Sequence, residues 1–388
     1  MPEVLAFALG LHVPKAFSLF YMLLGWLAWR SRGAPLPDLW IRLSAFMLLA
    51  FGLSYAAISV HYGLWQLGGR DLLDLISMLV LPAAGVLIGA LLAARTSWRS
   101  MGWLWLAYGM GALGYAWAVL LHGRVLMPDE HWMWLVQARW STTIAVPWGS
   151  DPLVNVRSIE QNAALVVTWW LPGLWLLLRE RQKLLGGLLL ACATAGLAAV
   201  VCFHGRRGYL MLVVGGLPLI WLMPRSAWLW RTLGAGAAAL LGLLLWKPQL
   251  AQRLSDERFD RFAGFFPVTP QFPWGGNQLH FEGVLPFDAR QGELMHNVLF
   301  DIYVRVGWLP VLLLSLALLP LLWRSLGALV AGLSQRKQRG GVLLAASLLL
   351  CLTVQWLFQP LIFGDGLLFY FGFLLLGFLA AKSHELQR

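Results

Sequence analysis

A short run of polar residues stands where a long hydrophilic segment gives way to an apolar one, at residues 293–310. It contains His296 and Asn297, followed by Asp301 and Arg305. The unperturbed pKa of histidine lies near neutrality, which suits a general base. Asn297 can cap the helix that follows, and Asp301 and Arg305 are four residues apart, so they can pair on its surface. An imidazole and a guanidinium at such a border indicate chemistry at a membrane surface rather than a pore.

A second group of charges, Arg206 and Arg207, directly precedes Gly208 and another apolar run. Two arginines at a helix N-terminus add side-chain charge to the free backbone N–H groups, which makes an anion site. Neither a P-loop sequence nor a dinucleotide-binding glycine pattern occurs, so a nucleotide fold has no support, and no nucleic-acid partner is expected. A lipid-linked pyrophosphate is the anion that fits this location.

The segment between these two groups holds further candidates. Residues 251–266 have apolar side chains near helical spacing, which predicts an amphipathic helix on the membrane surface with Arg258 and Arg261 along one side. An interfacial anchor with snorkelling arginines would show the same pattern. The stretch that follows contains Arg290 and is too rich in Pro and Gly for a long regular element. Its histidines lack a zinc-ligand spacing, so no metal or other cofactor is expected.

Composition decides which elements must position these residues. The chain has 388 residues, of which 59% are hydrophobic and 12% charged, and its mean hydropathy is +0.69. A soluble domain averages about 25% charged residues, and a spanning helix needs roughly 17–25 apolar ones. Solid apolar runs also argue against the alternating strands of a barrel. We therefore expect an all-α polytopic membrane protein.

Hydropathy predicts about eleven transmembrane helices, within a range of ten to twelve, in a single membrane domain over residues 1–388. Two long loops, 122–161 and 247–297, separate some of them, and the second includes the amphipathic segment. The predicted spans are 5–28, 41–60, 72–94, 101–121, 162–178, 184–203, 208–223, 228–246, 298–323, 342–360 and 364–381.

The basic residues set the expected orientation, because they crowd the short connections that alternate with the long loops. By the positive-inside rule these short connections face the cytoplasm, with the N-terminus outside and the C-terminus inside. On the other face Lys15 and Lys247 are the only lysines and the remaining cations are arginines, which suit either a phosphate-bearing ligand or lipid head groups. The predicted cytoplasmic residues are Arg30, Arg32, Arg42, Arg95, Arg99, Arg179, Arg181, Lys183, Arg225, Arg231, Arg324, Arg336, Lys337, Arg339, Lys382 and Arg388.

The order of these motifs resembles the O-antigen ligase/polymerase superfamily of polytopic membrane glycosyltransferases. In that family an Arg-Gly pair opens a span, a long periplasmic loop follows, and a His-Asn pair precedes an apolar helix with a glycine about ten residues on. Arg207-Gly208, the loop 247–297 and His296-Asn297 with Gly307 match this pattern. The resemblance implies a GT-C-like fold, catalytic roles for Arg207 and His296, and a loop arginine that corresponds to Arg258 or Arg261.

The resemblance also implies an inverting, metal-independent transfer of a glycan from undecaprenyl pyrophosphate to an acceptor hydroxyl, at the periplasmic face of the bacterial inner membrane. The arginines, including Arg206 and Arg290, would hold the pyrophosphate, and His296 would take the acceptor's proton. The leading expectation is a ligase that moves O-antigen to lipid A-core; the alternative is a polymerase that uses the same donor. A flippase or transporter would be expected to carry ionisable residues at mid-span. The predicted spans are nearly free of charge and the charged residues gather at one face, which favours the enzyme.

Overall fold

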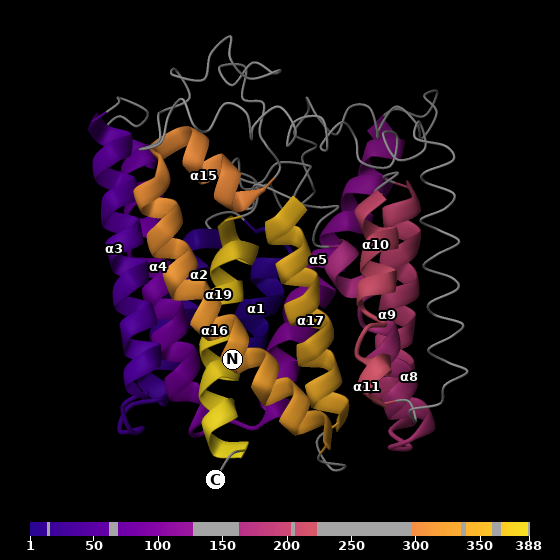
Figure 1. Ribbon diagram of the computed structural model, residues 1–388. Coiled ribbons are helices and arrows are strands. Elements are labelled where there is room, and N and C mark those ends of the chain that lie inside the picture. Colours follow the sequence, from indigo (N-terminus) through magenta and orange to yellow (C-terminus); the bar gives the residue numbers. More distant parts are fainter. Residues whose placement is uncertain are drawn as a thin grey trace, which may run out of the picture.

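The computed structural model is built of helices that stand side by side in one bundle (Figure 1). It describes residues 1–13, 16–61, 69–126, 163–202, 206–222, 297–334, 339–358 and 366–386. These residues contain no strand, which confirms the predicted all-α class. In chain order the helices are α1 (Pro2–Gly10), α2 (Ala16–Arg30), α3 (Leu39–His61), α4 (Gly69–Ala93), α5 (Trp98–Leu126), α8 (Trp170–Leu178), α9 (Lys183–Cys202), α10 (Arg206–Val214), α11 (Leu219–Leu222), α15 (Val298–Val306), α16 (Trp308–Ser334), α17 (Arg339–Phe358) and α19 (Gly366–Leu386).

Six helical stretches in the described ranges are long and apolar enough to cross a membrane. A helix of about 20 residues is about 30 Å long, which matches the hydrocarbon core of a bilayer. The chain is therefore a polytopic helical membrane protein, as its hydropathy predicts. The predicted span 228–246 lies outside the described residues, so the total of eleven stays a prediction. The six stretches are Leu39–His61, Ile76–Ala93, Ser100–Leu121, Lys183–Cys202, Trp308–Ser334 and Arg339–Leu357, and the shorter apolar ones are Ala163–Leu178 and Tyr370–Ser383.

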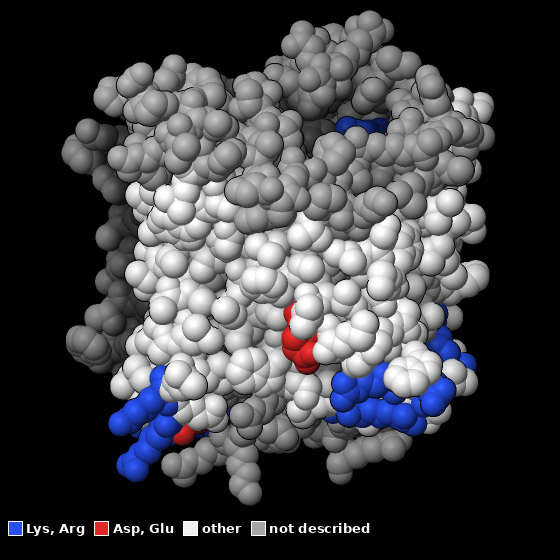
Figure 2. All heavy atoms as spheres, turned by 180° about the vertical axis from the view of Figure 1, so that it is seen from behind, with Lys and Arg blue, Asp and Glu red and all other residues white. Residues whose placement is uncertain are grey.

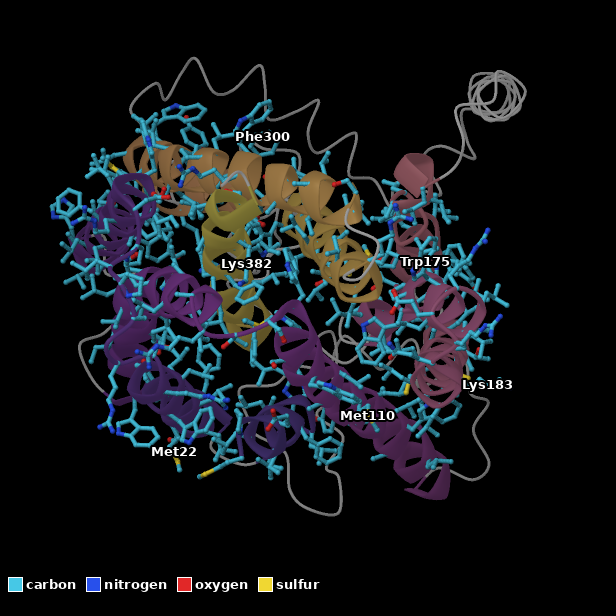
Figure 3. The ribbon with its side chains drawn as sticks, turned by 90° about the horizontal axis from the view of Figure 1, so that it is seen from below. Met22, Met110, Trp175, Lys183, Phe300 and Lys382 are labelled. Carbon is cyan, nitrogen blue, oxygen red and sulfur yellow. The ribbon has the colours of Figure 1, made fainter. Side chains whose placement is uncertain are left out.

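The core of the bundle lies around α19, whose side chains are buried on all sides between residues 370 and 380. Viewed from below, other helices surround α19 (Figure 3). Two glycines let α19 and α4 approach closely: a Cβ at Gly89 would lie 2.1 Å from the carbonyl oxygen of Leu374, and one at Gly377 2.1 Å from that of Val86. Small residues at such crossings allow the backbone contact that holds membrane helices together.

The predicted first span, 5–28, is wrong, because the chain turns back on itself between α1 and α2. Residues 11–13 leave the helix, and His12 has a left-handed φ of 51°. Glu3 of α1 and Arg30 of α2 line the same cavity, so the start of α1 and the end of α2 lie at one end of the bundle. The N-terminal end therefore lies on the same side as Arg30, not on the opposite side as predicted.

The break between α1 and α2 is accommodated because α1 packs tightly against α5. A Cβ at Gly10 would lie 2.0 Å from the carbonyl oxygen of Tyr108. The side chain of His12 is fully buried, and its ring centroid lies 5.0 Å from that of Tyr115. Non-helical backbone at membrane depth is tolerated where protein covers it. Packing on α5 therefore allows a turn inside a sequence that is apolar on both sides.

The predicted span 298–323 also divides, at Gly307, into the short α15 and the long α16. Gly307 has φ 89° and ψ −173°, a backbone conformation that is essentially restricted to glycine. The rings of Tyr303 and Trp308 pack across the break with their centroids 4.3 Å apart. α16 runs along the bundle to Ser334, whereas α15 turns away from it at the end of the bundle (Figure 1).

Three smaller departures from the predicted spans have local causes. The span 162–178 is interrupted by a turn at residues 168–169, since Pro172 has no N–H to donate and its ring crowds the carbonyl four residues earlier. The span 208–223 is interrupted at residues 215–218, a Gly-Gly-Leu-Pro sequence, between α10 and α11. α5 continues to Leu126, so the first residues of the predicted loop 122–161 are helical.

Lysine and arginine gather at one end of the bundle, which we call the basic end (Figure 2). They stand after α2 and α4, in the turn between α8 and α9, and at the start of α17. This grouping confirms, for the described residues, that the basic connections share one face. α15 lies at the other end, which we call the opposite end, and carries Arg305 (Figure 1).

Candidate functional site

Part of the predicted site falls within the described structure. Asn297, Asp301 and Arg305 belong to α15 or precede it directly. Arg206 and Arg207 form the first turn of α10, with only their backbone described. The predicted residues that lie outside the described ranges are His296, Arg258, Arg261, Arg290, the amphipathic helix 251–266 and, of the two long loops, residues 127–161 and 247–296.

Asn297 caps α15, as its position in the sequence predicts. Its Oδ1 accepts hydrogen bonds from the backbone N–H groups of Leu299, at 3.0 Å, and Phe300, at 3.2 Å. Its Nδ2 donates a third bond, of 3.0 Å, to the carbonyl oxygen of Leu357 in the last turn of α17. A helix end leaves its last carbonyls without intrahelical partners, so one amide serves two helix ends. In the chain, His296 directly precedes this junction.

Asp301 and Arg305 are not on the helix surface where the sequence places them. Asp301 is 2% exposed, and Arg305 is half-buried. The guanidinium of Arg305 donates a hydrogen bond to the hydroxyl of Tyr55 in α3, which is 1% exposed and lies within electrostatic range of Asp301. The Arg305–Tyr55 hydrogen bond therefore joins α15 to α3 beside the buried Asp301 carboxylate, in surroundings where a polar contact counts for more than it would in water.

Tyr55 is the site residue that the sequence does not reveal. It stands in the middle of an apolar span, with no motif or periodicity to distinguish it from a residue of the core. The available signal was that a Tyr hydroxyl buried in a span needs a hydrogen-bond partner. A cation at the border of another span, such as Arg305, is a suitable candidate for that partner.

Packing explains why glycine stands at position 208 in the Arg207-Gly208 pair. A Cβ at Gly208 would lie 2.0 Å from Cγ1 of Val200, which is fully buried in α9. Only glycine lets the first turn of α10 lie this close to α9. The free N–H groups at the start of α10, together with the backbone positions of Arg206 and Arg207, are therefore fixed relative to the bundle.

α17 bonds to residues that adjoin both α10 and α15. The hydroxyl of Ser347 donates a hydrogen bond of 3.4 Å to the carbonyl oxygen of Gly215, just beyond the end of α10. The carbonyl of Leu357, ten residues further along α17, accepts the bond from Asn297. Leu357 therefore lies about 15 Å beyond Ser347 along α17. α10 runs in the opposite direction, so its start lies about 13.5 Å from Gly215 toward the same end of the bundle. The starts of α10 and α15 therefore lie at a similar height, at the opposite end of the bundle (Figure 1).

This arrangement brings two helix starts to one end of the bundle, and His296 directly precedes the capped start of α15 in the chain. Among the described residues no group of three or more His, Cys, Asp and Glu side chains could hold a metal ion. No family model matches the chain, and no curated protein matches it.

Proposed function

We propose that the protein is a membrane glycosyltransferase of the O-antigen ligase type, which moves a glycan from undecaprenyl pyrophosphate to the hydroxyl of a lipid A-core acceptor. One observation carries the proposal: α17 bonds to Gly215 after the end of α10 and to Asn297 before α15, and the starts of α10 and α15 lie at the end of the bundle opposite the basic connections. The Arg206–Arg207 and His296–Asn297 pairs are far apart in the chain, and this arrangement favours their cooperation in one site. The resemblance of the two pairs to one family points the same way.

In this proposal the arginines bind the donor. Arg206 and Arg207 add two guanidinium groups to the backbone N–H groups at the start of α10, and a guanidinium binds phosphate oxygens with two parallel bonds. Arg258, Arg261 and Arg290 of the loop add positive charge over the same pyrophosphate. As the bond to the sugar breaks, this charge stabilises the departing undecaprenyl pyrophosphate.

His296 is the proposed general base. It takes the proton of the acceptor hydroxyl while the hydroxyl oxygen attacks the anomeric carbon, and the bond from that carbon to the pyrophosphate oxygen breaks. Attack on the face opposite the leaving group inverts the anomeric configuration. Asn297 caps the start of α15, and the Arg305–Tyr55 hydrogen bond beside Asp301 joins α15 to α3. These are therefore positioning residues in the proposal. No metal ion takes part in these steps.

The location follows from the same proposal. With the basic end in the cytoplasm, the site faces the periplasm of a bacterial inner membrane, where lipid-linked glycans are found. A lipid carrier reaches such a site from the bilayer while its sugar stays in water. The described part of the bundle supports an enzyme over a flippase, because its lysines and arginines gather at the ends in this view (Figure 2).

The direct test is reconstitution of the purified protein with a lipid-linked glycan and two acceptors, lipid A-core and a second lipid-linked glycan. We expect glycosylated lipid A-core, formed equally well in EDTA. Chain extension on the lipid carrier instead would identify the alternative, a polymerase. Transport of the intact donor with no new glycosidic bond would overturn the enzyme proposal, and loss of activity in EDTA with recovery on adding a divalent ion would overturn the metal-free mechanism.

A further inference from the structure

A cavity opens at the basic end, far from the proposed site. α1, α2 and the α4–α5 turn surround it, and the empty space there, open solvent at the mouth included, is about 380 Å³. Its polar lining consists of Glu3, Arg30, Thr96 and Ser100, and Leu27 and Leu104 are among its apolar lining residues. A charged mouth over an apolar interior matches the amphipathic character of a membrane lipid rather than that of a soluble metabolite.

Arg30 lines this mouth, and Arg32 and Arg95 stand in the two chain turns that adjoin its lining residues. Arg30 stacks on Trp26, with its guanidinium carbon 5.3 Å from the ring centroid, and Arg32 stacks on Trp29 at 4.7 Å. Arg95 comes from the other turn: one of its guanidinium nitrogens would lie 3.3 Å from a Cβ placed at Gly33. Stacking on an indole holds a guanidinium plane in place while its N–H edges stay available to an anion.

We propose that this cavity binds the head group of an anionic phospholipid that carries hydroxyls, of which phosphatidylglycerol is the simplest. Arg30, Arg32 and Arg95 together exceed the single charge of Glu3, so the mouth suits one phosphodiester. The Glu3 carboxylate and the Thr96 and Ser100 hydroxyls can accept hydrogen bonds from head-group hydroxyls, which a choline head group does not possess.

The local secondary structure favours the same ligand. α5 begins at this mouth, and its start is capped by Ser97, whose Oγ accepts a 3.3 Å hydrogen bond from the N–H of Ser100. The N-terminal end of a long helix carries a partial positive charge that favours phosphate. An acyl chain can follow the buried side chains of Leu27 and Leu104. The bound lipid would fill the open end of the α1–α2 hairpin.

The basic end offers a matched control for this proposal. The turn between α8 and α9 carries Arg179, Arg181 and Lys183, which have the same charge as the three arginines of the mouth. Unlike Arg30, none of these three residues lines the cavity, and unlike Arg32 and Arg95 none stands within three residues of one that does. A lipid attracted only by the overall positive potential would therefore respond equally to neutralisation of either turn.

The test is native mass spectrometry of the full-length protein, released from nanodiscs that contain equal amounts of phosphatidylglycerol and phosphatidylcholine. We expect phosphatidylglycerol to be retained selectively, and the Arg30→Gln/Arg95→Gln double variant to lower its retention by roughly tenfold or more, since each arginine near an anionic surface contributes appreciably to the affinity. The Arg179→Gln/Arg181→Gln variant should retain it as the unaltered protein does.

Equal losses in the two double variants would overturn the proposal, and so would equal retention of the two lipids. A third arm adds millimolar inorganic phosphate; complete displacement of the lipid by it would show a free-anion site instead. If Arg30→Gln/Arg95→Gln fails to accumulate, Thr96→Val/Ser100→Ala removes head-group hydroxyl partners and keeps the charge. In nanodiscs that contain equal amounts of phosphatidylglycerol and phosphatidylserine, that variant should reduce the preference for phosphatidylglycerol, and an unchanged preference would contradict the assigned head group.

Discussion

The two ends of the bundle use polar groups in different ways. At the basic end carboxylates close contacts between helices: Asp38 before α3 pairs with Arg324 of α16, and Glu180 accepts hydrogen bonds of 2.9 Å from the N–H of Gly340 and 3.1 Å from Nε1 of Trp175. At the opposite end, Asn297 and the Tyr55–Arg305 pair hold one short helix. The first set joins helices of the scaffold. The second fixes the start of α15, which His296 directly precedes in the chain.

α17 belongs to both sets. Glu180 accepts from the N–H of Gly340 in its first turn, and Asn297 donates to the carbonyl of Leu357 in its last turn. A carboxylate at a helix N-terminus and a donor at the C-terminus each satisfy groups that the helix leaves unpaired. α17 is therefore fixed at both ends, which makes it a suitable support for the two clusters of the proposed site.

The largest expected contrast between the ends comes from substituting one arginine at each. We expect Arg207→Lys to lower glycan transfer by about 10²–10³-fold, because a point charge replaces the guanidinium fork that contacts the pyrophosphate. Arg181→Lys, at the basic end, should leave transfer unchanged. The measurement is initial rate in the reconstituted assay at matched protein levels. Full activity of Arg207→Lys would reduce the site to a general positive potential.

The next contrast concerns the break before α16. Gly307→Ala places a Cβ in a backbone conformation that costs about 1–3 kcal/mol for a residue other than glycine. We expect a thermal midpoint lower by several degrees, measured in detergent, together with reduced transfer. Gly25→Ala in α2 is the control, since nothing lies within 4 Å of its added Cβ. Equal midpoints for the two variants would show that the break at Gly307 is unimportant to stability.

Asn297 allows its two bonds to be separated. Asn297→Ala loses both the cap of α15 and the bond to Leu357, and loss of an N-cap costs about 1 kcal/mol. Asn297→Asp retains the capping oxygen and loses only the donor to α17. We expect transfer to fall in both variants and stability to fall mainly in the first. If Asn297→Asp transfers glycan at the unaltered rate, the connection to α17 does not position the site.

The smallest effect concerns the pairing of Asp38 with Arg324. Burial raises the pKa of Asp38, but the hydrogen bond and charge of Arg324 and the N–H of Ile41 outweigh it, so the pKa lies below its usual value. A carboxyl whose pKa is depressed by folding stabilises the protein above its unfolded pKa, near 4, and this contribution is lost as the pH falls below it. Asp38→Asn should remove part of the acid sensitivity of thermal unfolding and leave transfer unchanged. An identical pH profile would show that the pair contributes nothing.

Sequence reasoning succeeded where the signal is local. The long spans follow from uninterrupted apolar runs, and the cap at Asn297 follows from its position before such a run. It failed at residues 11–13 and at Gly307, where the chain leaves the helix between two apolar stretches. Hydropathy averages over such a break, and the packing that permits it, such as that of α1 on α5, comes from residues distant in the chain.

The candidate site divides in the same way. The Arg207-Gly208 and His296-Asn297 pairs could be selected from the sequence because they stand at the borders of apolar runs. The bonds from α17 to Gly215 and Asn297 could not be predicted, since Ser347 and Leu357 look like ordinary residues of a span. Tyr55 was missed for the same reason. Asp301 and Arg305 were expected on a helix surface because their spacing alone does not reveal that α3 covers them.

The most direct measurement compares the two histidines of the second loop. His296→Ala and His280→Ala remove the same group from the same segment, but only His296 directly precedes the cap of α15. In liposomes with lipid-linked glycan and lipid A-core, we predict that His296→Ala inserts normally and loses transfer by about 10²–10⁴-fold, the contribution of a general base, while His280→Ala retains it. Transfer by His296→Ala at the unaltered rate would contradict the account.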